Sequence, residues 1–228
     1  MDEIEITSLD AYNSWPVITK APNGDLLVFY GKGIRHLYDN NRKVVYKRSK
    51  DKGTIWDNEI TLASFPNSYD CSIFSVTTTK NGTIIAIVRK TNDEILQRQS
   101  ALAYRSTNNG ITWESQEIQG LPIDHSYLCS TIEIPGRGIL SSFENTTPEA
   151  TEYIAYFIWS FDDGLTWGNI QEISKSTNKF DNPYEIALGY LGFGKILGIA
   201  RVEDTIIGNS SLFQIQSNEC PIRHQAHR

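Results

Sequence analysis

The stretch SFDDGLTW at residues 160–167 decides the fold, because it recurs along the chain. Residues 49–56 read SKDKGTIW, and residues 106–113 read STNNGITW. The three starts are 57 and 54 residues apart. Near residue 217 the sequence SNECP keeps the serine and an acidic residue but loses the glycine and the tryptophan. A motif that returns at such a period predicts an array of similar structural units.

Each copy has the composition of a tight turn between two strands. An Asp or Asn side chain accepts hydrogen bonds from backbone amides just ahead of it and closes the turn. The glycine two positions later takes a positive φ at little cost. The tryptophan then enters the following strand as a large apolar anchor. The residues expected to hold the three turns are Ser49, Asp51, Gly53 and Trp56, then Ser106, Asn108, Gly110 and Trp113, then Ser160, Asp162, Gly164 and Trp167.

Short apolar runs form a second pattern with the same period. They cover residues 26–29, 84–88, 139–140 and 196–200. The residues just after these runs, at steps of 58, 55 and 57, are Gly31, Arg89, Glu144 and Arg201. Further strand-like stretches lie before and after each octapeptide. Four short strands in each unit of about 55 residues are typical of a β-propeller blade.

The predicted fold class is all-β, because no stretch shows sustained helical periodicity. We predict one β-propeller domain over residues 1–228, built from about four four-stranded blades of which the last is incomplete. The expected blades cover residues 12–62, 63–118, 119–173 and 174–228.

The composition excludes several classes of protein. With 21 basic and 27 acidic residues, the formal net charge of −6 argues against a general nucleic-acid binder. No apolar run is long enough to span a membrane, and the acidic start lacks the features of a signal peptide, so a cytoplasmic location is the default expectation. Cys71, Cys129 and Cys220 have neither the number nor the spacing of a disulfide framework or a zinc site. We therefore expect neither a metal nor another cofactor.

The octapeptides resemble the Asp-box, or BNR repeat, Ser-x-Asp-x-Gly-x-Thr-Trp, of the sialidase (neuraminidase) superfamily. The third copy matches at every defined position, whereas the first has Ile55 in place of Thr and the second has Asn108 in place of Asp. The resemblance covers residues 12–217. It implies a six-bladed propeller whose Asp-boxes lie on the rim, away from the active site. A ring of six such blades would need about 330 residues, so this chain holds about four of them.

The resemblance also implies site residues. In the sialidase superfamily an Arg-Ile-Pro element opens the first blade, and its arginine binds the substrate carboxylate; here Ser14 stands at the arginine position. Asp39 falls at the position of the acid/base aspartate, and Asp70 resembles the aspartate that faces the sugar substituents. Glu185 resembles the glutamate that activates the nucleophile, and Arg201 resembles the second carboxylate-binding arginine. The third arginine and the nucleophilic tyrosine belong to later blades.

These residue types suit glycoside hydrolysis through an oxocarbenium-like transition state. The resemblance makes Asp39 the acid that protonates the leaving oxygen and Glu185 the base that takes the proton of the nucleophile. Converging arginines would bind a carboxylate through bidentate hydrogen bonds. The expected substrate-binding residues are Asp70, Arg201, Arg89 and Glu144.

Each of these assignments has a structural alternative. Asp39 lies in a polar loop, where an aspartate commonly forms a turn. Asp70 stands beside a strand start and is equally suited to capping it. Arg201 could pair with a neighbouring blade at its strand end, and Glu144 could be an ordinary residue of the rim.

The leading hypothesis is a sialidase-like glycoside hydrolase domain or fragment that recognises sialosides or related sugars in a central funnel, weak or inactive as this chain alone. The alternative is a non-catalytic glycan-binding or scaffold propeller. A third hypothesis is a glycosidase that acts on another, neutral sugar. The expected partner is thus a carbohydrate, with no nucleic acid and no membrane span. Open blade edges expose unpaired strands, which also predicts self-association.

Overall fold

The computed structural model describes residues 4–7, 10–36, 39–92, 99–122, 125–145, 153–176, 184–204 and 209–217. Within these ranges the regular structure consists of fifteen β-strands, and no helix is present. No helix of the described residues is therefore long and apolar enough to cross a membrane. The all-β prediction is confirmed.

The strands form four antiparallel sheets, each from consecutive segments of the chain. The first sheet (blade 1) contains β1 (Tyr12–Lys20), β2 (Leu26–Gly33), β3 (Lys43–Ser49) and β4 (Ile60–Ser64). The second sheet (blade 2) contains β5 (Asp70–Thr78), β6 (Ile84–Thr91), β7 (Gln99–Ser106) and β8 (Glu114–Glu117). The third sheet (blade 3) contains β9 (His125–Ile134), β10 (Gly138–Asn145), β11 (Tyr153–Ser160) and β12 (Gly168–Ser176). The fourth sheet (blade 4) contains β13 (Tyr184–Gly192), β14 (Lys195–Asp204) and β15 (Asn209–Ser217).

Within each blade the strands follow one another in sequence order, as short antiparallel hairpins require. The outer strands of blades 1 and 3 run to Ser64 and Ser176, slightly past the expected limits at residues 62 and 173. Blade 4 has three strands among the described residues. The chain is therefore a series of meanders, each equivalent to one unit of the sequence repeat.

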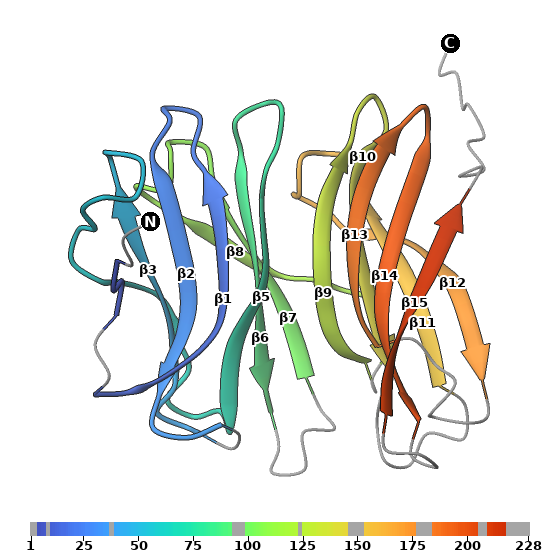
Figure 1. Cartoon of the computed structure of the whole chain (residues 1–228), viewed down its shortest axis with the longest axis horizontal. Helices are drawn as coiled ribbons and strands as arrows, with labels where there is room; N and C mark the ends of the chain where they lie inside the picture. The colour runs from blue at the N-terminus through green and yellow to red at the C-terminus, as the bar shows by residue number, and fades with distance from the viewer. Residues whose placement is uncertain are drawn as a thin grey trace.

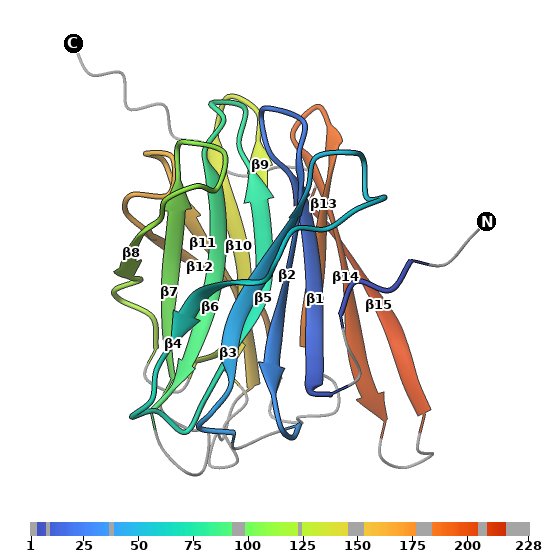
Figure 2. The same ribbon diagram turned by 90° about the vertical axis from the view of Figure 1, so that its left-hand side faces the viewer.

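The four blades lie side by side in an open arc (Figure 1). The first strand of each blade contacts the first strand of the next, from β1 through β5 and β9 to β13. Blades 1 and 4 stand at the two ends of this series, with blades 2 and 3 between them (Figures 1 and 2). This is the arrangement of consecutive blades around a propeller axis.

The hydrophobic core lies between the blades. On β6, the side chains of Ile84 and Val88 pack in a cluster with Phe29 of blade 1. The alternate side chains Ile85 and Ile87 pack in a cluster shared with blade 3. A strand whose two faces are both buried reads as a continuous apolar run, because side chains alternate between the faces. This is why residues 84–88 are all apolar.

The three Asp-box turns have the same hydrogen bonds. In each, the serine hydroxyl donates to Oδ1 of the Asp or Asn and accepts from the glycine amide. A second amide, four residues after the Asp or Asn, also donates to Oδ1. The expected turn chemistry is thus present in all three copies, and Asn108 replaces Asp because Oδ1 alone accepts these bonds.

The tryptophan of the second turn packs against the preceding blade. The ring of Trp113 lies 5.8 Å from Phe29 and 6.0 Å from Tyr46, in edge-on geometry. Tyr46 also donates a hydrogen bond of 3.0 Å from its hydroxyl to the carbonyl of Gly110. The second Asp-box therefore joins two blades as well as closing a hairpin.

Candidate functional site

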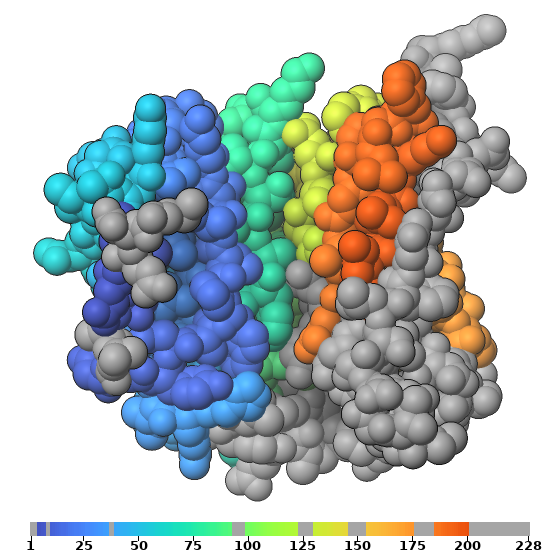
Figure 3. Space-filling model, in the orientation of Figure 1, coloured from blue at the N-terminus to red at the C-terminus, as the bar shows by residue number. Residues whose placement is uncertain are grey.

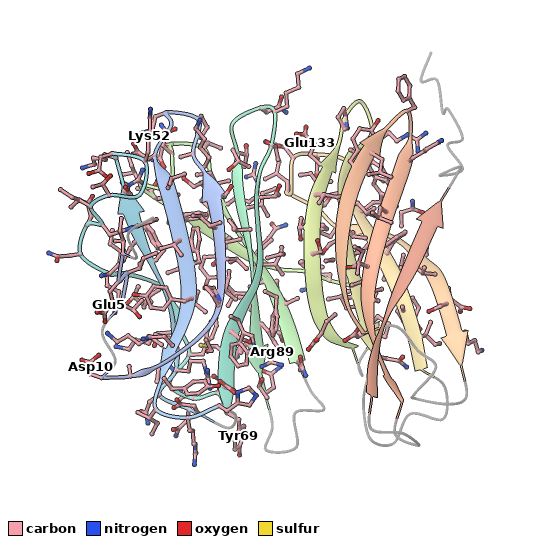
Figure 4. The ribbon with its side chains drawn as sticks, viewed as in Figure 1. Glu5, Asp10, Lys52, Tyr69, Arg89 and Glu133 are labelled. Atoms are coloured by element: carbon pink, nitrogen blue, oxygen red, sulfur yellow. The ribbon has the colours of Figure 1, made fainter. Side chains whose placement is uncertain are left out.

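The two ends of the blades carry different groups of residues. Lys52, in the first Asp-box, and Glu133 label the upper end in Figure 4, whereas Arg89 and Tyr69 label positions toward the lower end. The upper end, with the Asp-boxes, is called the box end here. The lower end, where the second strand of each blade finishes, is called the site end. In the space-filling view, blades 2 and 3 lie recessed between blades 1 and 4 (Figure 3).

Four residues that directly follow the apolar runs lie at one level of the site end, as strand pairing shows: Gly31, Arg89, Glu144 and Arg201. Gly31 pairs with Ser14, Arg89 pairs with Ser72 and Arg201 pairs with Tyr184 on the first strand of its blade. On the third strand, Arg89 faces Ala101 and Glu144 faces Ala155. The predicted equivalence of these positions therefore holds for the backbone. The side chain of Arg201 lies outside the described residues.

Arg42, just before β3, connects blades 1 and 2 at the site end. Its Nε donates to Asp70 Oδ1 at 2.8 Å, and its Nη1 donates to Ser14 Oγ at 2.8 Å. Nη2 donates to the carbonyls of Arg35 and His36. The side chains of Arg42 and Asp70 are both fully buried. The pair satisfies the requirement that a buried charge be matched by an opposite charge and hydrogen bonds.

Asp70 contributes further to this buried cluster. Its Oδ1 also accepts the amide of Cys71, so the residue caps the start of β5 as well as pairing with Arg42. Burial first, and then the nearby Asp70 carboxylate, raise the pKa of the Cys71 thiol to about 12. The thiol therefore stays protonated at neutral pH.

Three polar side-chain atoms on β5 and β6 differ from this cluster in their hydrogen bonding. Asp70 Oδ2, Ser72 Oγ and Thr91 Oγ1 are buried and have no hydrogen-bond partner among the residues that the structure describes. Asp70 pairs with Thr91 across the two strands, and Ser72 pairs with Arg89. Buried polar groups in folded proteins are nearly always hydrogen-bonded to protein, water or ligand. A hydroxyl group that reached these atoms would supply the missing hydrogen bonds.

Asp39 holds its own loop together. Its carboxylate accepts the amides of Ile34, Arg35 and Asn41. Its side chain is buried, with 1% of the residue exposed. These contacts are those of an aspartate that stabilises a turn.

Glu144 and Glu185 meet at the junction of blades 3 and 4. Glu144 is 1% exposed, and its Oε2 accepts the amide of Glu185 at 2.9 Å. The Glu185 side chain is exposed. A buried carboxylate of one blade thus orients the backbone that carries an exposed carboxylate on the next.

Aromatic side chains cover the buried arginines. The Arg42 guanidinium carbon lies 4.7 Å from the Trp15 ring centre, and that of Arg89 lies 5.0 Å from Phe74. Arg89 itself is 3% exposed. Trp15 and Phe74 are themselves 5.9 Å apart, so one aromatic surface extends over both guanidinium groups.

Two side chains of the site end stand on an unusual backbone. Trp15 has a φ of 50° and Glu185 has a φ of 51°. Both lie where the pairing register shifts, between Ser14 and Val17 on β1 and between Tyr184 and Ala187 on β13. Bulges of this kind re-aim side chains and are common beside functional sites. Trp15 and Glu185 therefore hold matching positions on the first strands of blades 1 and 4.

No group of three His, Cys, Asp or Glu side chains in the described part of the chain could hold a metal ion. The charged groups of Asp39, Arg42, Asp70 and Glu144 are instead bonded to backbone amides, carbonyls or each other. The arrangement offers buried hydrogen-bonding atoms, one exposed carboxylate and an aromatic surface.

Residues 6–199 match the family model described as "BNR repeat-like domain". The chain belongs to this family. A comparison of the sequence with curated proteins finds no significant match. As a BNR repeat-like protein, the chain has a fold that is shared with solved propellers of the sialidase superfamily, at identities too low to indicate more than the fold.

Three solved structures illustrate the similarity. A Hadza microbial sialidase, Hz136, has a TM-score of 0.68 and 18% identity over 89% of this chain and 44% of its own. Trypanosoma rangeli sialidase in complex with the inhibitor DANA has a TM-score of 0.69 and 16% identity over 90% of this chain and 36% of its own. Penicillium chrysogenum alpha-L-arabinanase complexed with arabinobiose has a TM-score of 0.65 and 16% identity over 91% and 63%. The BNR repeat-like chain thus spans less than half the length of these two sialidases.

Sequence reasoning overlooked two groups of residues in this BNR repeat-like chain. Arg42 carries no local signal, because its partners Ser14 and Asp70 are each 28 residues away. The other group had a signal: an arginine precedes the serine of the first two Asp-boxes, at Arg48 and Arg105. Each of these arginines donates to a backbone carbonyl of the next blade's Asp-box, at 2.6 Å and 2.8 Å.

Proposed function

We propose that this chain forms the carbohydrate-recognising blades of a sialidase-like glycoside hydrolase, which holds a sialoside or a related sugar at the site end. The observation that carries the proposal is the group of buried polar atoms on Asp70, Ser72 and Thr91 without partners among the described residues. A sugar presents many hydroxyl groups, each able to donate and accept hydrogen bonds. When the side chains that cover these atoms move aside, a sugar hydroxyl supplies the hydrogen-bond partners that the atoms lack.

Glu185 is the residue that we propose for proton transfer. Its side chain is exposed, while its backbone is held by the buried Glu144 carboxylate. An exposed carboxylate on a fixed backbone can take a proton from a nucleophile beside the anomeric carbon. The nucleophile itself would come from outside these four blades; on these blades alone, Glu185 would activate a water molecule in its place, which gives weak turnover.

Asp39 is proposed as the acid that protonates the leaving oxygen, on the strength of its sequence position. For that role its carboxyl would have to turn from the amides of Ile34, Arg35 and Asn41 toward the substrate. The same contacts favour a second candidate function, a non-catalytic glycan-binding or scaffold module, in which Asp39 only holds its loop.

A hydrolysis assay on the full chain separates the two candidates. The substrates are a fluorogenic sialoside and a fluorogenic arabinofuranoside, tested with the variants Glu185→Gln and Asp39→Asn. A matched control is Asp51→Asn at the box end, since Asn108 shows that Asn fits an Asp-box. If the hydrolase proposal is correct, turnover falls at least about a hundredfold in Glu185→Gln and Asp39→Asn, which is the lower range for general acid–base catalysis. Asp51→Asn retains the turnover of the parent chain.

Absence of turnover with retained binding on a glycan array identifies the non-catalytic module. Absence of both turnover and glycan binding contradicts both candidates.

A further inference from the structure

We propose that Tyr12, Trp15, His36 and Phe74 form a stacking subsite for the ring of a neutral saccharide. These four residues are called the aromatic platform. The proposal rests on the carbohydrate recognition proposed above and specifies the class of sugar. The juxtaposition that carries it is a partly exposed aromatic surface directly above two buried guanidinium groups.

The rings of the aromatic platform are continuous. Trp15 lies 5.9 Å from Phe74 and 5.7 Å from His36, and His36 lies 5.7 Å from Tyr12 between ring centres. Tyr12 and His36 are exposed, and Trp15 and Phe74 are half-buried. The platform therefore presents aromatic carbon to solvent at the site end, where blades 1 and 2 meet.

The two cations beneath the platform are not available to a ligand. Arg42 is fully buried, and its Nε is paired with Asp70. Arg89 is 3% exposed and lies against Phe74. A carboxylate needs charged donors that reach it directly. To reach either guanidinium, a carboxylate would have to displace an aromatic ring, so the surface selects an uncharged ligand.

The backbone shows that Trp15 is held in place at a cost. A bulky residue with a φ of 50° is uncommon and persists only where the surrounding structure enforces it. Trp15 also matches Glu185 in register, at the bulge of the first strand of its blade. Its ring is therefore directed to the same end of the molecule as the exposed carboxylate of Glu185.

A neutral saccharide matches this surface chemically. One face of a pyranose or furanose ring can present mainly C–H groups, which pack against aromatic carbon, while its hydroxyl groups lie at the edge. The hydrogen bond of 2.6 Å between the Tyr12 hydroxyl and His36 Nδ1 places polar atoms at the edge of the platform. Aromatic surfaces with a few fixed polar groups are typical of small-ligand sites.

The test compares lactose and arabinobiose with 3′-sialyllactose, using isothermal titration calorimetry on the full chain. Lactose and 3′-sialyllactose differ only by the sialic acid, so the pair isolates the effect of the carboxylate-bearing sugar. We expect binding of a neutral sugar that is at least as tight as that of 3′-sialyllactose. Trp15→Ala should weaken it by about tenfold, whereas Trp15→Phe should keep it within about threefold, because stacking of this kind is worth about 1.4 kcal/mol.

Tyr12→Ala provides an independent variant, because the Tyr12 side chain is exposed and its removal leaves the Arg42–Asp70 pair intact. It should weaken binding in the same direction, and thermal unfolding reports whether each variant is folded. Trp56→Phe, in the Asp-box at the opposite end, is the matched tryptophan control and should bind as the parent chain does.

Three results would overturn the inference. Tighter binding of 3′-sialyllactose than of lactose, lost in Arg35→Ala, would show that the exposed Arg35 selects an anion instead. Neutral-sugar binding that folded Trp15→Ala and Tyr12→Ala both retain would place the sugar elsewhere and leave the proposed function standing. Absence of binding to every saccharide would contradict the inference and the proposed function together.

Discussion

At the scale of the residue, a single oxygen organises each Asp-box. Oδ1 of Asp51, Asn108 or Asp162 accepts the serine hydroxyl and a backbone amide. The residue after it in each copy, Lys52, Asn109 or Asp163, has a φ near 60°, immediately before the glycine. Two left-handed residues in succession reverse the chain within a short span. The second is glycine in all three copies, and at Gly110 and Gly164 close packing from the preceding blade also limits its side chain.

A comparison of Gly164 with Gly53 separates the free-energy cost of packing from the cost of the left-handed backbone conformation. Both have positive φ, but a Cβ on Gly164 would lie 2.5 Å from Ile85 Cδ1 of blade 2, whereas one on Gly53 has no contact closer than 3.7 Å. We expect Gly53→Ala to cost about 1–2 kcal/mol of unfolding free energy from the left-handed conformation alone. Gly164→Ala should cost about 1–3 kcal/mol more from overpacking.

Urea denaturation of the two variants makes this comparison directly. Equal losses for Gly164→Ala and Gly53→Ala would show that the blade interface adjusts freely around the added methyl group.

Asp162 gives the third Asp-box a pH dependence that the second lacks. Burial raises the pKa of Asp162, but hydrogen bonds from the Thr166 hydroxyl and amide and from Ser160 outweigh it, so the net pKa is lowered from 3.8. A carboxyl with a lowered pKa in the folded state stabilises the fold above its unfolded pKa, and this stabilisation is lost as pH falls through the folded pKa. The loss therefore lies below about pH 4.

We expect Asp162→Asn to reduce the fall in stability between pH 5 and pH 2.5. Asn108 already makes the equivalent bonds, with its amide nitrogen donating to the Thr112 hydroxyl at 2.8 Å, so the variant should be nearly as stable as the parent at pH 7. Chemical denaturation at several pH values measures the difference. An unchanged pH profile would mean that the Asp162 carboxyl titrates alike in the folded and unfolded chain.

At the scale of the element, neighbouring blades are fastened at the box end by arginines. Arg105, the residue before the second Asp-box, donates from Nε to the carbonyl of Asp163 at 2.8 Å. Its Nη2 lies 3.7 Å from the Asp163 carboxylate. Arg48 reaches Asn109 of blade 2 in the same way and pairs with Asp25 in its own blade. The guanidinium suits this position because it holds two acceptors at once in a fixed geometry.

Arg105→Lys should lower the unfolding free energy by about 1–2 kcal/mol, because a lysine cannot reproduce the two directed contacts. Lys50→Ala is the control: its ion pair with Asp57 is largely exposed, so its removal should change stability by less than about 0.5 kcal/mol. Thermal and urea unfolding measure both variants. If Arg105→Lys costs no more than Lys50→Ala, the arginine does not fasten the blades.

At the scale of the whole molecule, the outer face of blade 1 bears directly on self-association. Thr19 bonds to Thr78 of blade 2, so Ile18, its neighbour on β1, points away from blade 2. Ile18 is 57% exposed. The equivalent faces of the other blades in the arc are covered by neighbouring blades. An exposed isoleucine on this face of blade 1 favours association with another apolar surface.

We predict that the chain self-associates through this face and that Ile18→Lys weakens the association. Sedimentation velocity over a range of protein concentrations measures it. Ile111→Lys, at an exposed position in the second Asp-box, is the matched control and should leave the association unchanged. Association that is equally strong in both variants would assign it to another surface, and a monomer at every concentration would contradict the prediction.

The sequence by itself determined the repeating architecture. The Asp-box is a local device, closed by hydrogen bonds between residues two to four positions apart, so its recurrence can be counted without knowing the fold. The apolar run at residues 84–88 likewise indicated a strand, and the structure shows that both of its faces are buried. Family membership follows from the same pattern, since the match to the BNR repeat-like domain covers residues 6–199.

Only the tertiary structure decided how the charges of the site end are used. In the sequence, Ser14 and Asp70 are isolated positions. In the structure, the Arg42 side chain bonds to both, although Arg42 is 28 residues away from each. The tertiary structure likewise places the Glu144 carboxylate against the backbone of Glu185, and it places the aromatic platform over two arginines. The physical reason is range: turns are stabilised by neighbours in sequence, whereas a buried charge takes its partner from whatever strand the packing brings beside it.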